Sequence, residues 1–358
     1  MIRSLLALLA VLALACAATA HAAPCMTVTL TGTQGGPAAY NGLAGAGTLV
    51  RYGDDADNCG AVSLQFDAGR GTNMRLAQLG VTPGKLDALF FTHMHSDHSD
   101  GLADLLQLRW HFEYTRPKLD LICANDATAP QGHVMSCRNF VARIGDALLA
   151  SGEIAQRRSE DAARPAGGPV DIVKLATFTP TNQPQVLWTS GSAQGNASGV
   201  VQVSAIRSTH LAGHASYRVD TPAGSVVIGG DAGNDTLAPP RASSTSAQVE
   251  LLAKGADVLV HSAIHPVMAP EQGSGFAAPN YYRQSGATDL GALAQRAGVR
   301  VLMYTHMIPA LGAERQGPYK IPGGPLSAAD WQKAAAAGGF TGTLVVGTDL
   351  ASVRLPAR

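Results

Sequence analysis

Apolar and β-branched positions predict a series of short strands in the first part of the chain. Alternating or apolar runs predict strands at 26–30, 48–52, 62–66 and 86–91, with a short helix near 73–79. A helix is expected to start within 101–106. The middle of the chain, from Arg109 to about Val200, is less regular. Its pattern predicts a strand at 119–122, a helix at 138–151 and an exposed loop at 157–168.

Strands and helices alternate again in the second part. The pattern predicts strands at 200–206, 216–220, 225–229, 258–260 and 301–304, and helices at 247–253 and 289–297. An alanine-rich helix at 328–337 and a strand pair at 342–346 and 351–355 end the chain. Strands lead and helices intervene in both halves, without a sequence repeat. We therefore expect an α/β fold, an αββα sandwich in which two mixed β-sheets lie between outer helices.

The N-terminal segment 1–22 has the pattern of a secretory signal peptide. A basic start at Arg3 precedes the apolar run 5–15, and small residues fill 18–22. Cleavage is expected after Ala22, with Ala20 as the alternative. A lipoprotein signal through Cys16 is disfavoured because Ala13 lies where such signals usually have leucine. The apolar run is too short to span a bilayer comfortably, and no later run offers a membrane span. We therefore expect a periplasmic or secreted protein.

Composition narrows the class of partner. The chain has 358 residues, 46% of them hydrophobic, and its formal net charge is zero. It is long enough for a sizeable core, and its charge balance argues against binding nucleic acid or an anionic membrane surface.

Four cysteines remain once Cys16 leaves with the signal peptide. In an oxidising compartment, an even number predicts two disulfides. Sequence order suggests pairs Cys25–Cys59 and Cys123–Cys137, although four cysteines allow three pairings. The rival interpretation, cysteine as a zinc ligand, is disfavoured because none of the four lies in a CxxC pattern or beside the histidine cluster.

Side chains that can bind a metal are concentrated in one loop, Thr92-His93-Met94-His95-Ser96-Asp97-His98. Four metal-ligand side chains fall within six residues, between a predicted buried strand and the start of a predicted helix. Such a loop can direct all four side chains at one point. Imidazole nitrogens and carboxylate oxygens are ligands that zinc takes at catalytic sites.

Three further candidate ligands lie where apolar strands end. His210 follows the strand at 200–206, Asp231 follows 225–229, and His306 follows 301–304. Polar groups at strand ends often cap turns instead. Together with the loop, however, they complete the ligands that a two-metal site needs, since an open zinc site takes about three protein ligands per metal.

These segments resemble the metallo-β-lactamase superfamily, and within it the ribonuclease Z and arylsulfatase-like branch. The His-x-His-x-Asp-His loop is similar to the superfamily's signature. The segments similar to the branch are 31–37, 66–72, His210 with Tyr217-Arg218, Gly230-Asp231 and 305–309. The resemblance covers nearly the whole mature chain. It implies that residues 23–358 form one hydrolase domain with the metallo-β-lactamase fold.

The resemblance also implies a ligand set for two zinc ions, although other divalent metals can take the same ligands. His93, His95 and His210 would hold the first ion. Asp97, His98 and His306 would hold the second, and Asp231 would bridge the two. Asp67 would orient a histidine by accepting its other N–H.

One segment departs from the branch. His261 matches the histidine that donates a proton to the leaving group, but Ser262 stands where ribonuclease Z usually has glutamate. His261 is the expected acid and Asp97 the expected base that steers the attacking hydroxide. His265 can take over the acid role or cap a turn, and capping is favoured. His214 is expected to be structural or to line the rim of the site.

The expected activity is hydrolysis of a small-molecule phosphodiester or aryl sulfate ester, with a lactone or another ester as the alternative. A zinc-binding protein without catalysis is a further alternative. Processing of precursor tRNA, the branch's best-known role, is disfavoured because an exported protein does not meet precursor tRNA and no lysine-rich arm is present to grip RNA. Trp110, His111, Tyr114 and Trp188 can line an apolar pocket for an aryl group, or can be ordinary packing. A homodimer stays open.

Overall fold

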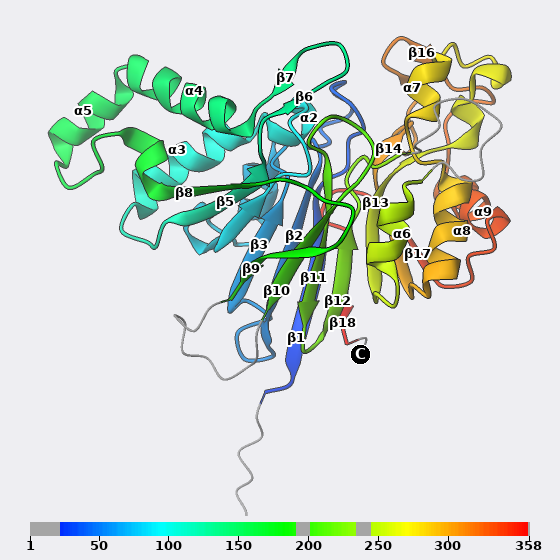
Figure 1. Ribbon diagram of the computed structural model, residues 1–358, viewed down its shortest axis with the longest axis horizontal. Helices are drawn as coiled ribbons and strands as arrows, with labels where there is room; N and C mark the ends of the chain where they lie inside the picture. The colour runs from blue at the N-terminus through cyan, green and yellow to red at the C-terminus, as the bar shows by residue number, and fades with distance from the viewer. Residues whose placement is uncertain (1–21, 191–200, 234–244, 357–358) are drawn as a thin grey trace, which may run out of the picture.

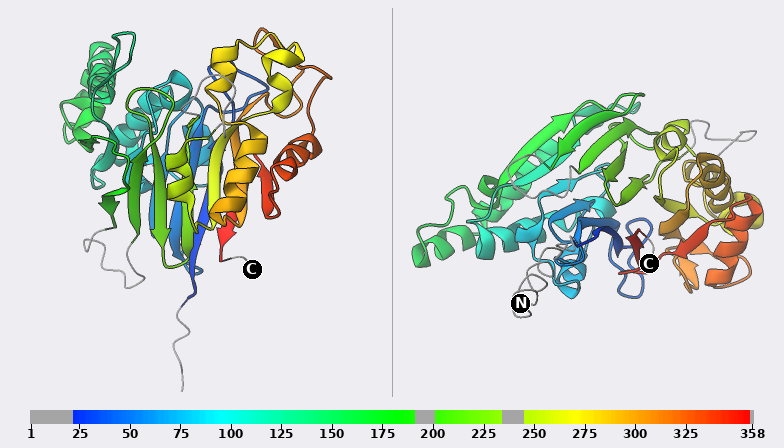
Figure 2. Two further views of the ribbon diagram at one scale, coloured as in Figure 1. Left: turned by 45° about the vertical axis from the view of Figure 1, so that its right-hand side comes forward. Right: turned by 90° about the horizontal axis from the view of Figure 1, so that it is seen from below.

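The computed structural model describes residues 22–190, 201–233 and 245–356. Within these residues, two seven-stranded mixed sheets lie face to face, and helices cover their outer faces (Figures 1 and 2). The predicted αββα sandwich is confirmed. The N-terminal segment 1–21, which carries most of the predicted signal peptide, lies outside the described residues.

The first sheet has the order β18-β1-β2-β3-β4-β5-β8. Its strands are β1 (Pro24–Gly32), β2 (Gly47–Asp54), β3 (Val62–Phe66), β4 (Ala88–Phe90), β5 (Leu119–Ala124), β8 (Val173–Phe178) and β18 (Ser352–Leu355). From β3 to β8 the neighbouring strands are parallel, so their carboxyl ends meet at one edge.

The second sheet has the order β17-β14-β13-β12-β11-β10-β9. Its strands are β9 (Gln185–Thr189), β10 (Gln202–Arg207), β11 (Ala215–Thr221), β12 (Gly224–Ile228), β13 (Val258–Ile264), β14 (Val301–Ile308) and β17 (Thr343–Val346). Strands β12, β13 and β14 are parallel neighbours. Two small ribbons, β6 (Ala127–Thr128) with β7 (Val134–Met135) and β15 (Arg315–Gln316) with β16 (Tyr319–Lys320), lie in the connections.

Helices cover each sheet on its outer side. The first sheet carries α1 (Thr72–Gln78), α3 (Leu102–Glu113) and α4 (Cys137–Ala150), and the second carries α6 (Ala247–Ala253), α8 (Ala287–Ala297) and α9 (Ala328–Ala337). The shorter helices are α2 (Ser96–Ser99), α5 (Glu153–Glu160) and α7 (Ala278–Tyr282), with 3₁₀ turns at Pro83–Lys85, Gly168–Ile172, Pro266–Met268 and Pro270–Gln272.

The central core lies between the two sheets. Phe66 and Phe90 of the first sheet stack at 4.8 Å, and the ring of Tyr217 from the second sheet packs against both. The buried hydroxyl of Tyr217 donates a hydrogen bond to the carbonyl of Phe91 at 2.7 Å. This contact joins the second sheet to the start of the histidine loop.

Two details differ from the sequence-based prediction. The strands predicted as a pair at the C-terminus do not pair with each other, because β17 joins the second sheet beside β14 and β18 joins the first beside β1. The reason is burial: Val345 and Val353 both pack on the core between the sheets. Part of the loop predicted at 157–168 is helical, because α5 extends to Glu160.

Two disulfides lie within the described residues, Cys25–Cys59 and Cys123–Cys137, which is the pairing that sequence order suggests. The first ties β1 to the turn after β2, and the second ties β5 to the start of α4. No helix in the described part of the chain is long and apolar enough to cross a membrane.

Candidate metal centre

The histidine loop is held against the segment Asp67-Ala68-Gly69, which follows β3. The amide of Ala68 donates to the carbonyl of His98 at 2.8 Å. A Cβ on Gly69 would lie 2.2 Å from the carbonyl oxygen of Asp97, so only glycine permits this close approach. The loop then forms the short helix α2, which carries Asp97 and His98.

The remaining candidate ligands come from the second sheet at the same edge of the sandwich. His210 follows β10, and Asp231 follows β12 after Gly230, which has a positive φ of 60°. His306 lies within β14, not after it. The β13–β14 register skips His306, and its φ is 43°, so it is the extra residue of a β-bulge. Bulges commonly redirect a side chain beside an active site.

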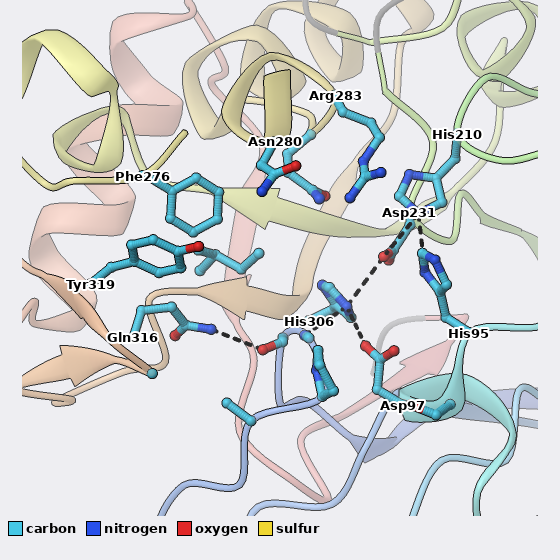
Figure 3. A pocket seen from close by; sticks show the side chains of 18 of the residues that line it. His95, Asp97, His210, Asp231, Phe276, Asn280, Arg283, His306, Gln316 and Tyr319 are labelled. Atoms are coloured by element: carbon cyan, nitrogen blue, oxygen red, sulfur yellow. Dashed lines mark hydrogen bonds and ion pairs between the residues drawn. The ribbon is translucent and has the colours of Figure 1, made fainter. Parts of the chain in front are cut away.

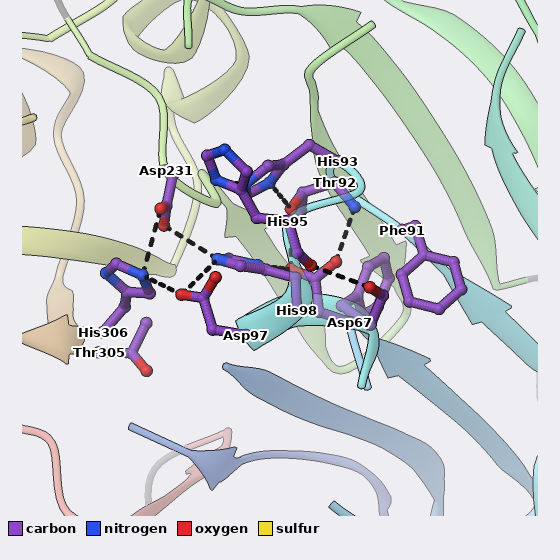
Figure 4. Close-up of polar contacts among 12 residues, drawn as sticks. Asp67, Phe91, Thr92, His93, His95, Asp97, His98, Asp231, Thr305 and His306 are labelled. Atoms are coloured by element: carbon purple, nitrogen blue, oxygen red, sulfur yellow. Dashed lines mark hydrogen bonds and ion pairs between the residues drawn. The ribbon is translucent and has the colours of Figure 1, made fainter. Parts of the chain in front are cut away.

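The structure brings all seven predicted ligands together (Figures 3 and 4). Among the described residues they form two groups, in each of which the ligand atoms lie within 4.8 Å of one another. The first group is His93, His95, His210 and Asp231. The second is Asp97, His98 and His306.

Ring nitrogens converge in the first group. Nδ1 of His95 lies 2.9 Å from Nε2 of His93 and 3.4 Å from Nε2 of His210. Two nitrogens bound to one tetrahedral zinc at its usual bond length lie roughly 3.3 Å apart. The spacing of these nitrogens therefore suits a shared cation.

Asp231 belongs to the first group and also faces the second. One of its carboxylate oxygens is 3.8 Å from Nε2 of His210 and 3.2 Å from Nε2 of His306, and the other is 3.5 Å from Nε2 of His98. Asp97 approaches His306 at 2.9 Å. Within the described structure, Nε2 of His98 and Oδ1 of Asp231 are buried without a hydrogen-bond partner. Such atoms are costly unless a ligand satisfies them.

Burial and charge set the protonation of the ligands. Burial drives the pKa of His93 and of His210 well below the ordinary histidine value, and it lowers the pKa of His95. Burial alone would raise the pKa of Asp97, but the hydrogen bond from His306 and the charges of neighbouring histidines lower it to about 2. Neutral imidazoles and ionised carboxylates are the forms that bind a metal.

His98 and His306 differ from the other three histidines. Burial opposes their charged forms, yet nearby carboxylates, Asp231 foremost, raise the pKa of both. A proton on each ring would offset the charge of the buried carboxylates, and a divalent cation would do the same. Donor type, nitrogen spacing, unpartnered atoms and charge balance all fit a divalent metal.

Asp67 supports the cluster through hydrogen bonds. Its carboxylate accepts hydrogen bonds from Nδ1 of His98 at 2.8 Å and from both the amide and the hydroxyl of Thr92 at 2.8 Å (Figure 4). The other nitrogen of the His98 ring, Nε2, then faces Asp97 and Asp231. Asp67 therefore fixes which ring nitrogen His98 offers to the cluster.

The cluster forms the floor of a cavity of about 420 Å³. His95, Asp97, His210, Asp231 and His306 line the cavity on one side. The rest of the wall comes from the Gly35–Ala38 turn and from two segments that the sequence did not single out, and it includes Phe276, Asn280, Arg283, Gln284, Gln316 and Tyr319 (Figure 3). No periodicity marks these positions.

The four aromatic and histidine positions considered for an aryl pocket do not line this cavity. Trp110 is buried against Ile154 and Ile172, and the indole N–H of Trp188 donates to Asp120 at 2.9 Å. Tyr114 hydrogen-bonds to Asp161, and His111 packs on Phe112. Trp110 and Tyr114 pack toward α5 and the Gly168–Ile172 turn, and Trp188 of β9 packs against the core between the sheets.

His261 and His265 do not line the cavity. His261 is fully buried, its Nδ1–H donates to the carbonyl of Ser262, and its ring lies against Gly229. Its predicted role as proton donor gains no support from this position. Nδ1 of His265 accepts from the amide of Val267 at 3.2 Å, which is the favoured turn-capping role.

His214 has a structural position next to the cluster. Its Nε2 accepts a hydrogen bond from the amide of Asp231 at 3.2 Å, and its Nδ1 lies 2.8 Å from the hydroxyl of Ser208. Burial lowers the pKa of His214 to about 3, so the ring is neutral. His214 holds the backbone of Asp231 and is absent from both ligand groups, as expected.

Comparisons with known proteins identify relatives of this chain. The chain is 30% identical to a ribonuclease Z of Mycobacterium sp. (strain KMS) over 332 residues, which cover 92% of this chain and 95% of the relative. Residues 58–130 match the family model described as anti-Pycsar protein Apyc1.

Two solved structures share the fold. The metallo-β-lactamase fold protein YhfI from Bacillus subtilis has a TM-score of 0.58 at 16% identity and covers 93% of this chain and 100% of its own. Zn²⁺-bound PqqB from Methylobacterium extorquens has a TM-score of 0.50 at 12% identity and covers 91% and 99%. Fold and site thus define a hydrolase of the metallo-β-lactamase fold. The chain belongs to the ribonuclease Z-like branch of the metallo-β-lactamase superfamily.

Proposed function

We propose that this protein is an exported dinuclear zinc hydrolase that cleaves a small phosphodiester or aryl sulfate ester. The observation that carries the proposal is the position of Asp231, which faces histidines of both ligand groups on the floor of a cavity. A carboxylate in that position can bridge two cations, and the cavity leaves room for an ester above them.

In this proposal His93, His95 and His210 would hold one zinc ion, Asp97, His98 and His306 would hold the other, and Asp231 would serve both. Two zinc ions supply a nucleophile from water at neutral pH and stabilise negative charge on the ester's oxygens.

The chain's own residues position the reaction. Asp97 lines the cavity in its ionised form, so it can orient the attacking water by accepting a hydrogen bond. Asp67 and His214 hold His98 and Asp231 in place. We assign no proton transfer to His261, because its side chain lies outside the cavity wall.

Export supports a small substrate over precursor tRNA. The signal-like pattern of residues 1–22 and the two disulfides suit a periplasmic or secreted protein. The net charge of zero offers no electrostatic attraction to RNA. We therefore carry over from the ribonuclease Z relatives the chemistry at the phosphorus centre and not the tRNA substrate.

A substrate panel on the zinc-loaded mature protein tests this proposal. The panel contains bis(4-nitrophenyl) phosphate, 4-nitrophenyl sulfate and a nitrophenyl-reporter lactone. Turnover of either anionic ester supports the proposal, whereas turnover of the lactone alone favours the lactonase alternative. Two bound zinc ions without turnover of any ester would indicate a binding protein. N-terminal sequencing of the protein expressed from the full chain checks export, and we expect it to begin at Ala23.

A further inference from the structure

Arg283 is a cation in the wall of the cavity. Among the described residues it forms no ion pair, and its buried Nε has no hydrogen-bond partner. Figure 3 shows its side chain directed toward Asp231 and His210.

The backbone of Arg283 is fixed relative to the metal ligands. A Cβ on Gly233 would lie 1.7 Å from the carbonyl oxygen of Arg283, so the end of α7 packs directly on the segment that follows Asp231. The hydroxyl of Ser285 donates to the carbonyl of Ala232 at 2.6 Å and holds the same two segments together. The guanidinium therefore starts from a fixed point beside the cluster.

An aromatic pair lines another part of the wall. The rings of Phe276 and Tyr319 lie 4.5 Å apart between centroids, at 51°. In Figure 3 they lie on the opposite side of the cavity from His95 and His210. Aromatic rings in a cavity wall offer a surface on which a planar ligand ring can stack.

Hydrogen bonds fix this pair before any ligand binds. The amide of Lys320, next to Tyr319, donates to the carbonyl of Ser274 at 3.0 Å, and the amide of Phe276 donates to the hydroxyl of Ser274 at 3.0 Å. Gln316 donates to the carbonyl of Gly35 at 2.9 Å and ties the same ribbon to the turn across the cavity. A fixed surface binds a ligand at a lower entropic cost.

We propose that Arg283 and the Phe276–Tyr319 pair form a two-part recognition site for an anionic ester that carries a planar aromatic ring. Arg283 binds the charged oxygens of the ester beside the metal cluster, and the aromatic pair stacks on the ring. Guanidinium groups suit phosphate and sulfate oxygens because they offer several donors in a planar fork. A neutral lactone would leave the charge of Arg283 unused. This inference rests on the proposed hydrolase function and names its substrate class.

Binding of two phosphonates tests the site without turnover. Phenylphosphonate carries the charge and the ring, and methylphosphonate carries the charge alone; calorimetry measures both on the zinc-loaded protein. Arg283→Gln should weaken the binding of both phosphonates by about tenfold or more, and Arg283→Lys should restore part of the lost affinity. Phe276→Leu or Tyr319→Leu should reduce the preference for phenylphosphonate about threefold or more and leave methylphosphonate unchanged.

Matched controls are Arg143→Gln and Phe112→Leu, at exposed positions far from the cavity wall, which should bind like the wild type. Three results would overturn the proposal: Arg283→Gln binding within twofold of the wild type, an unchanged phenyl preference in both aromatic variants, or loss of zinc from both Arg283 variants. The last would make Arg283 a support of the cluster.

The panel separates this inference from the proposed reaction. If no ester is hydrolysed but phosphonate binding depends on Arg283 and on the aromatic pair, the reaction fails and the recognition site stands. If anionic esters are hydrolysed but phosphonate binding does not depend on Arg283 or on the aromatic pair, only the inference about recognition fails.

Discussion

The carboxylate of Asp67 accepts a hydrogen bond from Nδ1 of His98 at 2.8 Å, and both side chains are almost fully buried. Asp67 follows β3 of the first sheet, with a positive φ of 55°, so the backbone takes an unfavourable conformation to place this contact. The contact leaves Nε2 of His98 free to face the carboxylates of the cluster. A residue 31 positions away in sequence thus orients a predicted ligand.

We expect Asp67→Asn to lower zinc affinity about 10- to 100-fold, because the amide cannot hold the His98 ring as the carboxylate does. Asparagine suits this test since it keeps the size of the side chain and tolerates a positive φ. Competition with a zinc-binding dye measures the affinity. The exposed Asp146→Asn serves as the control. Wild-type affinity in Asp67→Asn would show that the contact does not tune the site.

Zinc content and chelation test the two-metal assignment. We expect about two zinc ions per chain by atomic emission, and a lower melting temperature after chelation. A cation present at a free concentration about a thousand times its Kd stabilises the native state by about 4 kcal/mol. Removal also leaves Asp97 and Asp231 as buried carboxylates near each other. A reproducible content of one zinc per chain would contradict the dinuclear assignment.

His95→Ala should reduce turnover of the best panel substrate by about a thousandfold, because a metal that polarises the ester contributes several kcal/mol. His95 lines the cavity, and its Nδ1 lies within 3.4 Å of Nε2 of His93 and of His210. Its loss therefore removes one ring nitrogen from the first ligand group. Initial rates and zinc content are measured together, with the exposed His133→Ala as control. Full activity with normal zinc content would exclude the proposed role of the first group.

The ligand positions could be predicted from sequence because they follow local patterns. The loop from His93 to His98 packs four ligands into six residues, and His210 and Asp231 follow apolar strands whose ends meet at one edge of the sandwich. The bulge at His306 does not follow from the apolar run, since it depends on pairing with β13.

The cavity wall could not be predicted in the same way. Phe276, Arg283 and Tyr319 lie in short segments without periodicity, and they meet only through contacts such as Arg283 on Gly233. The pairing of the C-terminal strands was wrong for a related reason. A short connection favours a hairpin, but β18 pairs with β1 at the edge of the first sheet, where Val353 packs on the core between the sheets.

Loss of either disulfide should lower the free energy of unfolding. In the chain-entropy model, the 14-residue separation of Cys123 and Cys137 predicts a cost of about 3 kcal/mol, and the 34-residue separation of Cys25 and Cys59 predicts about 4 kcal/mol. Urea unfolding of the paired Cys→Ser variants measures both costs. Mass spectrometry of the wild type with and without a reducing agent confirms the pairing. Stability unchanged in both variants would show that neither bond forms in solution.

His261 should make the protein less stable in mild acid. Burial lowers its pKa in the native state to about 4, whereas an unfolded histidine titrates near about 6.5. As the pH falls from about 6.5 to about 4, the unfolded chain binds a proton that native His261 does not, so the free energy of unfolding falls by up to about 3 kcal/mol through this group. His261→Leu should remove this contribution to the pH dependence of the free energy of unfolding. Urea unfolding of the variant between pH 7 and pH 5 measures the change. Exposed His133→Leu serves as the control, and a wild-type slope in His261→Leu would mean that folding does not lower the pKa of His261.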